Sequence, residues 1–159
     1  MLRLGLLVAI GVIAVDQVTK YWALDTILLG QRIPVTDFFN LVLTFNPGIS
    51  FSLFQEAWGR WVFSALALAI VVGLAVWLRR QSAVWLGVAG GAIIGGALGN
   101  TIDRVVHGAV VDFLDFHAFG YHWPAFNAAD SAIVTGVVMI LTEGVIVGRR
   151  KTVNENDDV

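Results

Sequence analysis

Cysteine is absent from the 159-residue chain, and charged residues make up only 14% of it. Without cysteine the protein has no disulfide framework, no zinc–thiolate site and no thiol nucleophile. The basic residues are too few and too scattered for a nucleic-acid-binding face. Soluble domains are about 25% charged and about 45–50% apolar, whereas this chain is 57% hydrophobic with a mean hydropathy of +0.78. The composition therefore predicts one integral membrane domain.

Uncharged runs predict four membrane-spanning helices. Eighteen uncharged residues separate Arg60 from Arg79. Twenty-two separate Arg80 from Asp103, a length of about 33 Å as a helix. Runs of this length cross a bilayer. The expected helices cover about residues 4–24, 60–78, 82–102 and 124–147.

The basic residues predict the orientation of these helices. If both termini lie in the cytosol, six of the ten basic residues flank the cytoplasmic ends of the helices, as the positive-inside rule expects. Most acids then lie on or near the outer side. The first helix resembles a secretory signal, but no small-x-small cleavage pattern follows it, so a retained helix is expected. Residues 1–148 form the predicted domain, and residues 149–159 are expected to be a disordered cytoplasmic tail.

The outer loop, residues 25–57, is too long to be a bare connector. Apolar residues alternate with polar ones from Phe39 to Phe45, Asn46-Pro47-Gly48 is a turn signal, and the alternation resumes from Ile49 to Leu53. The predicted fold is therefore membrane all-α: a four-transmembrane-helix bundle with a small extracytoplasmic β-sheet or hairpin element on the outer loop.

Two acids stand out as candidates for chemistry. Asp130 lies inside the fourth expected helix, which Pro124 is expected to open, and Asn127 shares its face. Asp112 lies just beyond the third helix, on the side from which the fourth returns. Two carboxylates about 4 Å apart repel by about 4 kcal/mol at an effective dielectric near 20, so such a pair holds one proton at neutral pH. One ionised and one protonated acid suit peptide-bond hydrolysis without a metal, because one activates water and the other polarises the carbonyl.

The third expected helix carries a row of small residues. Its glycines recur every four residues, and glycine at this spacing lets another helix approach closely. Packing explains the glycines but not Asn100, which needs a hydrogen-bond partner inside the bundle. The main row is Gly87, Gly91, Gly95, Gly99 and Asp103, and its neighbour is Gly96, Asn100 and Arg104.

Other chemistries fit the sequence less well. A zinc site would have to use His107, His117 and His122, which lack metal-ligand spacing. A serine nucleophile would need Lys20 at its own depth, and Lys20 can also pair with Asp16 one helical turn away. A proton-coupled transporter would need a polar path to the inner side, which residues 131–142 hardly supply. A non-catalytic assembly subunit would leave the paired acids unexplained.

Four motifs together resemble the lipoprotein signal peptidase family, also called signal peptidase II or prolipoprotein signal peptidase. They are "DQVTK", "NPGISFS", "GGALGNTIDRVVHGAVVDFLDF" and "FNAADSAIVTG", and the likeness covers about residues 10–148. The resemblance implies an aspartic endopeptidase of the bacterial inner membrane, with its active site near the periplasmic face. Such enzymes cut diacylglyceryl-modified prolipoproteins just before the lipidated cysteine. They are expected to need no cofactor or metal and no nucleic-acid partner, and a monomer among membrane lipids is expected.

The resemblance also assigns roles by motif. It implies that Asp112 and Asp130 are the catalytic pair. The chain departs from the family pattern N-x-G-A-A-F-S at Pro47, Ile49 and Ser50, which bears on substrate contacts rather than on the reaction. The implied polar shell is Asn100, Asp103, Arg104 and Asn127, and the implied substrate-binding or structural residues are Asp16, Lys20, Asn46 and Gly48.

Overall fold

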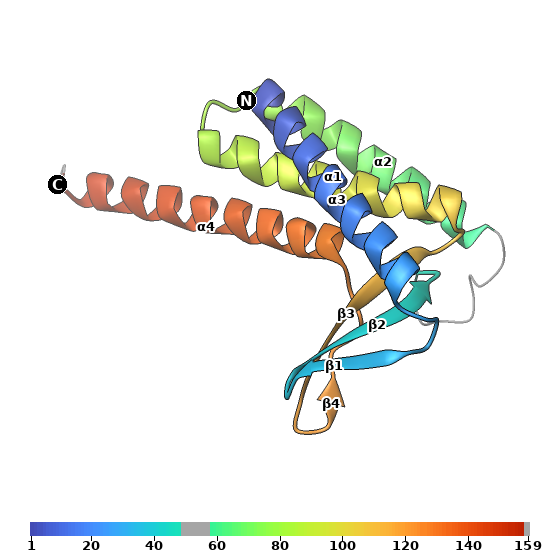
Figure 1. The fold of residues 1–159 in the computed structure, drawn as a ribbon. Coiled ribbons are helices and arrows are strands. Elements are labelled where there is room, and N and C mark those ends of the chain that lie inside the picture. The colour runs from blue at the N-terminus through green and yellow to red at the C-terminus, as the bar shows by residue number, and fades with distance from the viewer. Residues whose placement is uncertain (49–57, 158–159) are drawn as a thin grey trace.

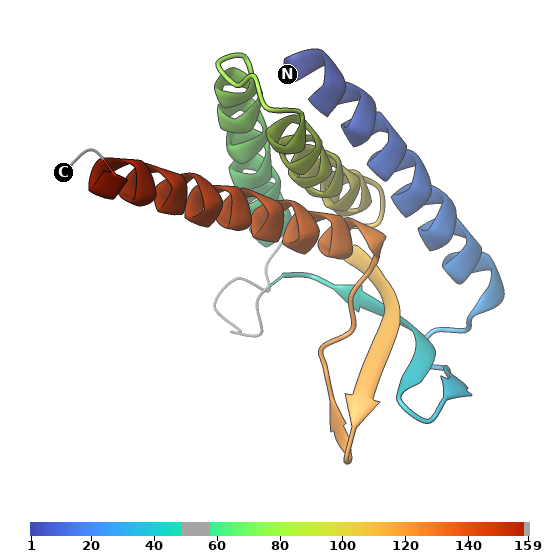
Figure 2. The same cartoon turned by 90° about the vertical axis from the view of Figure 1, so that its left-hand side faces the viewer.

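Helices form most of the molecule, which is a computed structural model describing residues 1–48 and 58–157, with side chains through Gly144 at the C-terminal end. Helices α1, α2 and α3 lie side by side, α4 diverges from them toward its C-terminus, and a small sheet projects from one end of the bundle (Figures 1 and 2). The helices are α1 (Leu2–Thr26), α2 (Gly59–Leu78), α3 (Val84–Val106) and α4 (Ala128–Asp157). The strands are β1 (Arg32–Thr36), β2 (Phe39–Asn46), β3 (Val110–Ala118) and β4 (Tyr121–His122).

The helices carry the apolar surface of a membrane protein. Within the described residues, α1, α2 and α3 are each long and apolar enough to cross a bilayer. Large side chains such as Leu7, Val18 and Val72 are more than half exposed on them. Lipid tails accept such side chains without the cost that water would impose. A crossing by α4 stays a prediction.

Helix α3 lies at the centre of the bundle, and its small residues explain why. A Cβ atom added to Gly95 would lie 2.7 Å from the backbone oxygen of Ala9 in α1. One added to Gly96 would collide with the backbone oxygen of Ala129 in α4. The predicted glycine rows therefore face two different helices, and each lets a neighbouring backbone approach closely.

The sheet contains a strand that the sequence analysis missed. All pairs are antiparallel in the order β1-β2-β3-β4, so β3 occupies the region that was expected to be a short outer turn. Its pairing partner β2 lies about 70 residues earlier in the chain, and no local pattern announces such a contact. Strand β2 has an irregularity between Leu41 and Thr44, the residues paired with Leu114 and Asp112. A bulge of this kind bends a strand beside a site. The expected strand at Ile49–Leu53 lies outside the described residues.

Helix α4 differs from its prediction at both ends. It begins at Ala128 rather than at Pro124, because the side chain of Asn127 caps it. Its helical backbone continues to Asp157, whereas a disordered tail was expected from residue 149.

Candidate active site

Asn127 joins the start of α4 to strand β3. Its Oδ1 accepts a hydrogen bond from the backbone N–H of Asp130 at 2.9 Å, the usual bond of a helix N-cap. Its Nδ2 donates to Asp112 Oδ1 at 2.7 Å and to the backbone oxygen of Val111 at 3.2 Å. One fully buried amide therefore fixes the third residue of α4 relative to the carboxylate on β3.

Phe126, the residue before Asn127, also connects the start of α4 to strand β3, here through backbone hydrogen bonds. The N–H groups of Phe113 and Leu114 donate to the backbone oxygen of Phe126 at 3.1 and 2.9 Å, and Phe126 N–H donates to Leu114 O at 3.1 Å. This short antiparallel bridge holds the segment before α4 against β3. These backbone hydrogen bonds therefore set the position of β3, which carries Asp112, relative to the start of α4, which carries Asp130.

Asp112 lies buried on β3 with donors on both oxygens. Asn46 Nδ2 donates to Oδ2 at 3.0 Å, and Asn127 donates to Oδ1. Burial raises the pKa of Asp112 from 3.8 to about 6, and the charge of nearby Asp130 acts in the same direction. The two hydrogen bonds and the charge of Lys20 oppose the rise without cancelling it. Asp112 therefore titrates nearer to neutrality than an exposed aspartate does.

Asp130 has a different environment. Its Oδ1 accepts a hydrogen bond from Asn100 Nδ2 at 2.7 Å, and Asn100 Oδ1 accepts from Asn127 Nδ2 at 3.2 Å. The two acids are thus linked through two asparagine side chains. Asp130 also lines a cavity of about 380 Å³ together with Trp123, Phe126, Ser131, Val134 and Thr135. Unlike Asp112, it is open to a molecule arriving along α4.

A buried ion cluster orients Asn100. Lys20 Nζ lies 2.9 Å from Asp16 Oδ2 and 2.7 Å from Asp103 Oδ2, and all three side chains are at most 2% exposed. The ammonium also donates to Asn100 Oδ1 at 2.9 Å. Because an ammonium group only donates, it requires the oxygen of the amide on its side. The Nδ2 of Asn100 is then left facing Asp130.

The same cluster ties four elements together. Asp16 Oδ1 accepts from the backbone N–H of Ala129 at 2.9 Å, in the first turn of α4, where a carboxylate is favourable. Asp103 Oδ2 accepts from Val111 N–H at 3.0 Å. The predicted pairing of Asp16 with Lys20 is present, but it lies in the interior and not at an exposed helix end.

Known proteins are similar to this chain in sequence and in fold. A family model described as signal peptidase (SPase) II matches residues 8–146. The chain belongs to the signal peptidase II family. It is 48% identical over 149 residues to a lipoprotein signal peptidase of Azoarcus sp. (strain BH72), covering 92% of this chain and 85% of that protein. It is 45% identical over 141 residues to one of Vibrio cholerae serotype O1 (strain ATCC 39315 / El Tor Inaba N16961), covering 86% and 78%.

Solved structures agree with this family membership. A bacterial membrane enzyme solved by the in meso method at 1.9 Å resolution superposes with a TM-score of 0.79 at 34% identity, covering 87% of this chain and 90% of that chain. A second, at 2.3 Å resolution, gives 0.78 at 33% identity, covering 94% of this chain and 90% of that chain. As a signal peptidase II family member the chain is a membrane peptidase.

Two predicted residues of this signal peptidase II family member lie beside the acids without bonding to them. Arg104 Nη1 donates to the backbone oxygen of Asn100 at 3.3 Å, and its guanidinium lies 5.8 Å from the ring centre of Phe63. Gly48 has a φ of +89° and its N–H donates to Asn46 Oδ1 at 3.0 Å. This turn requires glycine, and it aims the amide of Asn46 at Asp112.

Two polar groups near the site were not predicted from the sequence. Gln17 Nε2 lies within hydrogen-bond distance of Asp16 Oδ2 and Asp103 Oδ1, both at 3.1 Å. Its place inside "DQVTK" was the available signal. The second group is centred on buried Asp115, which accepts from Asn40 Nδ2 at 2.9 Å and lies 2.9 Å from His122 Nδ1. No local signal joins Asn40 to Asp115, because 75 positions separate them in the chain.

Proposed function

We propose that this protein is an aspartic endopeptidase that removes the signal peptide from diacylglyceryl-modified bacterial prolipoproteins. Its family membership supports the substrate class. The observation that carries the catalytic type is the pair Asp112 and Asp130, which come from a strand and a helix and are linked through Asn100 and Asn127. They are the catalytic residues of this proposal.

The pair holds one proton and divides the work of hydrolysis. The ionised carboxylate takes a proton from water as it attacks the scissile carbonyl, and the protonated one donates a hydrogen bond to the carbonyl oxygen. The acid that took the proton from water then passes it to the amide nitrogen as the C–N bond just before the lipidated cysteine breaks, so the pair is again left with one proton. The raised pKa of Asp112 supports a shared proton, because it brings one acid close to the working pH. No metal or other cofactor takes part.

The supporting residues hold this geometry. Lys20 fixes the amide of Asn100, Asn100 and Asn127 donate to the two acids, and Asp16 and Asp103 keep the charge of Lys20 compensated. Arg104 holds the end of α3 through the backbone of Asn100. Asn46 and Gly48 form the part of the outer loop that approaches the substrate.

The proposal includes a membrane setting, which the long apolar helices support. Residues 1–148 form one peptidase domain of four spans in the bacterial inner membrane, with both termini cytoplasmic and the site near the periplasmic face. The cavity beside Asp130 is lined by Val134, which is 62% exposed on α4. The acyl chains of a substrate would remain in lipid along α4 while the scissile bond reaches the acids. One chain supplies every residue of the site, so a monomer is sufficient.

A cleavage assay tests this proposal. The purified protein in detergent, with a chelator and no added metal, should cleave a diacylglyceryl prolipoprotein. Asp112→Asn and Asp130→Asn should each abolish cleavage while gel filtration and thermal unfolding show a folded protein. Asp115→Asn is the matched control, because Asp115 lies on the same strand without contacting either catalytic acid, and it should retain activity. Full activity in either of the first two variants removes that residue from the pair, and loss of wild-type activity on chelation contradicts the metal-free mechanism.

A further inference from the structure

The β3–β4 hairpin ends in an exposed aromatic surface. Five of the eleven residues in 116–126 are Phe, Tyr or Trp, and none is Asp, Glu, Lys or Arg. Phe119 is 103% exposed, Tyr121 is 85% exposed and Trp123 is 70% exposed. We call Phe116, Phe119, Tyr121 and Trp123, together with Phe38 from the neighbouring β-turn, the aromatic tip.

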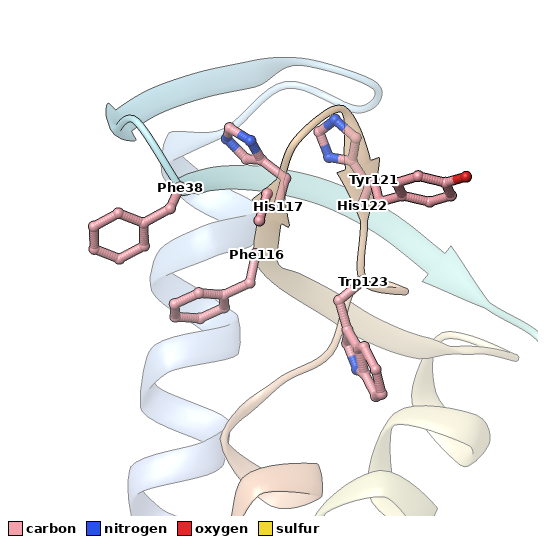
Figure 3. Close-up of a pocket in the computed structure, with 7 residues that line it drawn as sticks. Phe38, Phe116, His117, Tyr121, His122 and Trp123 are labelled. Atoms are coloured by element: carbon pink, nitrogen blue, oxygen red, sulfur yellow. The ribbon is translucent and has the colours of Figure 1, made fainter.

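The aromatic tip is a continuous surface. Figure 3 shows Phe38, Phe116, Tyr121 and Trp123 around one hollow, whose volume is about 570 Å³. The rings of Phe38 and Phe116 are 6.5 Å apart, and those of Phe116 and Phe126 are 5.8 Å apart. Trp123 and Phe126 also line the cavity beside Asp130. The aromatic surface therefore runs from the tip of the hairpin to the apolar side of α4.

The turn itself presents its largest ring outward. Phe119 has a φ of +51° and is followed by Gly120 at +81°. Asn or Asp normally occupies the first such position in a two-residue hairpin turn, because their side chains tolerate a positive φ. In water this position would combine an unfavourable backbone with an uncovered aromatic ring. An apolar environment around the ring removes the second disadvantage.

We propose that the aromatic tip is immersed in the interfacial layer of the lipid bilayer and anchors the sheet there. Trp and Tyr favour this layer because an apolar ring and a polar edge both find partners in it. The tip continues the lipid-facing surface of α4, where Val134, Val138 and Leu141 are exposed. The sheet also projects from one end of the bundle (Figures 1 and 2), and in a bilayer crossed by α1, α2 and α3 that end lies at the membrane surface.

This anchoring has a consequence for the site. Strand β3 carries Phe116 of the aromatic tip and Asp112 only four residues apart. An immersed tip therefore holds the carboxylate of Asp112 at a fixed depth relative to the bilayer. The inference itself depends on the membrane location of the chain and not on the proposed reaction, so a failed cleavage assay would leave it standing.

The absence of cysteine allows a direct test. A nitroxide label is placed at Phe119→Cys in the full-length protein, reconstituted in phosphatidylethanolamine–phosphatidylglycerol liposomes. Its collision rates with oxygen, which enters lipid, and with a water-soluble nickel chelate are measured by electron paramagnetic resonance. Val72→Cys on α2 is the lipid reference, and Gln31→Cys, an exposed position just before β1 and outside the aromatic tip, is the matched control. Tyr121→Cys provides a second label position on the tip.

The proposal expects the labels at Phe119 and Tyr121 to collide several-fold less often with the nickel chelate than the label at Gln31, and more often with oxygen. Equal nickel collision rates at the three positions would overturn it. A photoreactive group on the Phe119→Cys variant then identifies the occupant in native membranes. Lipid adducts support the proposal, whereas a discrete protein adduct at this position would replace the bilayer by a protein partner and overturn it.

Discussion

Replacing Asp112 by Asn should stabilise the folded protein at neutral pH while abolishing cleavage. The pKa of Asp112 lies at about 6 instead of 3.8, chiefly because the carboxyl group is buried. That difference of about two units corresponds to about 3 kcal/mol at neutral pH. Because the folded state binds the proton more tightly, stability falls as pH rises from about 3.8 to about 6, and the full cost is present above that window. An uncharged amide does not carry this cost.

The neighbours of Asp112 reduce the expected gain. Asn46 and Asn127 both donate to its oxygens, so the new NH₂ group of asparagine would face one donor. A lost or reversed hydrogen bond costs about 1–2 kcal/mol, which leaves a net gain of about 1–2 kcal/mol. For a chain of this size the melting temperature should then rise by roughly 2–8 °C.

Thermal unfolding in detergent, followed by tryptophan fluorescence at about pH 7.5 and about pH 4, measures this effect on both sides of the window. The gain should be present at the higher pH and largely lost at the lower one. Asp115→Asn is the control, because this substitution should lower the stability at neutral pH instead of raising it. Burial of Asp115 is outweighed by hydrogen bonds from Asn40 and His122, so its pKa is lowered and its charge contributes stability at neutral pH. A less stable Asp112→Asn protein at pH 7.5, or a gain independent of pH, would refute the reasoning.

Three further predictions concern groups around the acids. Lys20→Met should lower the free energy of unfolding by about 3–5 kcal/mol, because it leaves two buried carboxylates unpaired, and chemical denaturation measures this loss. Gly95→Ala should lower the free energy of unfolding by about 1–3 kcal/mol, because the added methyl group pushes α1 away from α3. The control is Gly11→Ala, whose methyl group meets no atom within 4 Å, and it should change stability by less than about 1 kcal/mol. Equal melting temperatures of the two variants would contradict this packing. Asn46→Ala removes a donor that favours ionised Asp112, so the acidic limb of the pH–rate profile should move upward by about one unit; an unmoved limb would contradict that role.

Local patterns in the sequence predicted the parts of the fold that depend on local chemistry. The glycines of α3 recur at the spacing of helix packing, and they do face α1 and α4. Asp130 was visible as an acid within an apolar run, and it does lie in the first turn of α4. Asn100 was expected to need a partner, and it contacts both Lys20 and Asp130.

Long-range contacts decided the rest. Strand β3 was missed because its partner β2 lies far away in the chain and its acids resemble a polar turn. Pro124 is a common first residue of a helix, but Asn127 begins α4 because its amide also meets Asp112. The sequence predicted that Lys20 pairs with Asp16 on the same helix, but it did not show that Asp103 on α3 also compensates its charge in the interior.

The side chain of Asn127 makes two contacts with different consequences. Its oxygen caps the N-terminus of α4, and its nitrogen donates to Asp112 on β3. Loss of this one side chain would therefore affect both the fold and the proposed chemistry. Neither rotation of α4 about its axis nor slippage along it leaves both bonds intact. The placement of the acids therefore depends on secondary structure, and a substitution of Asn127 should disturb both the start of α4 and the position of Asp112.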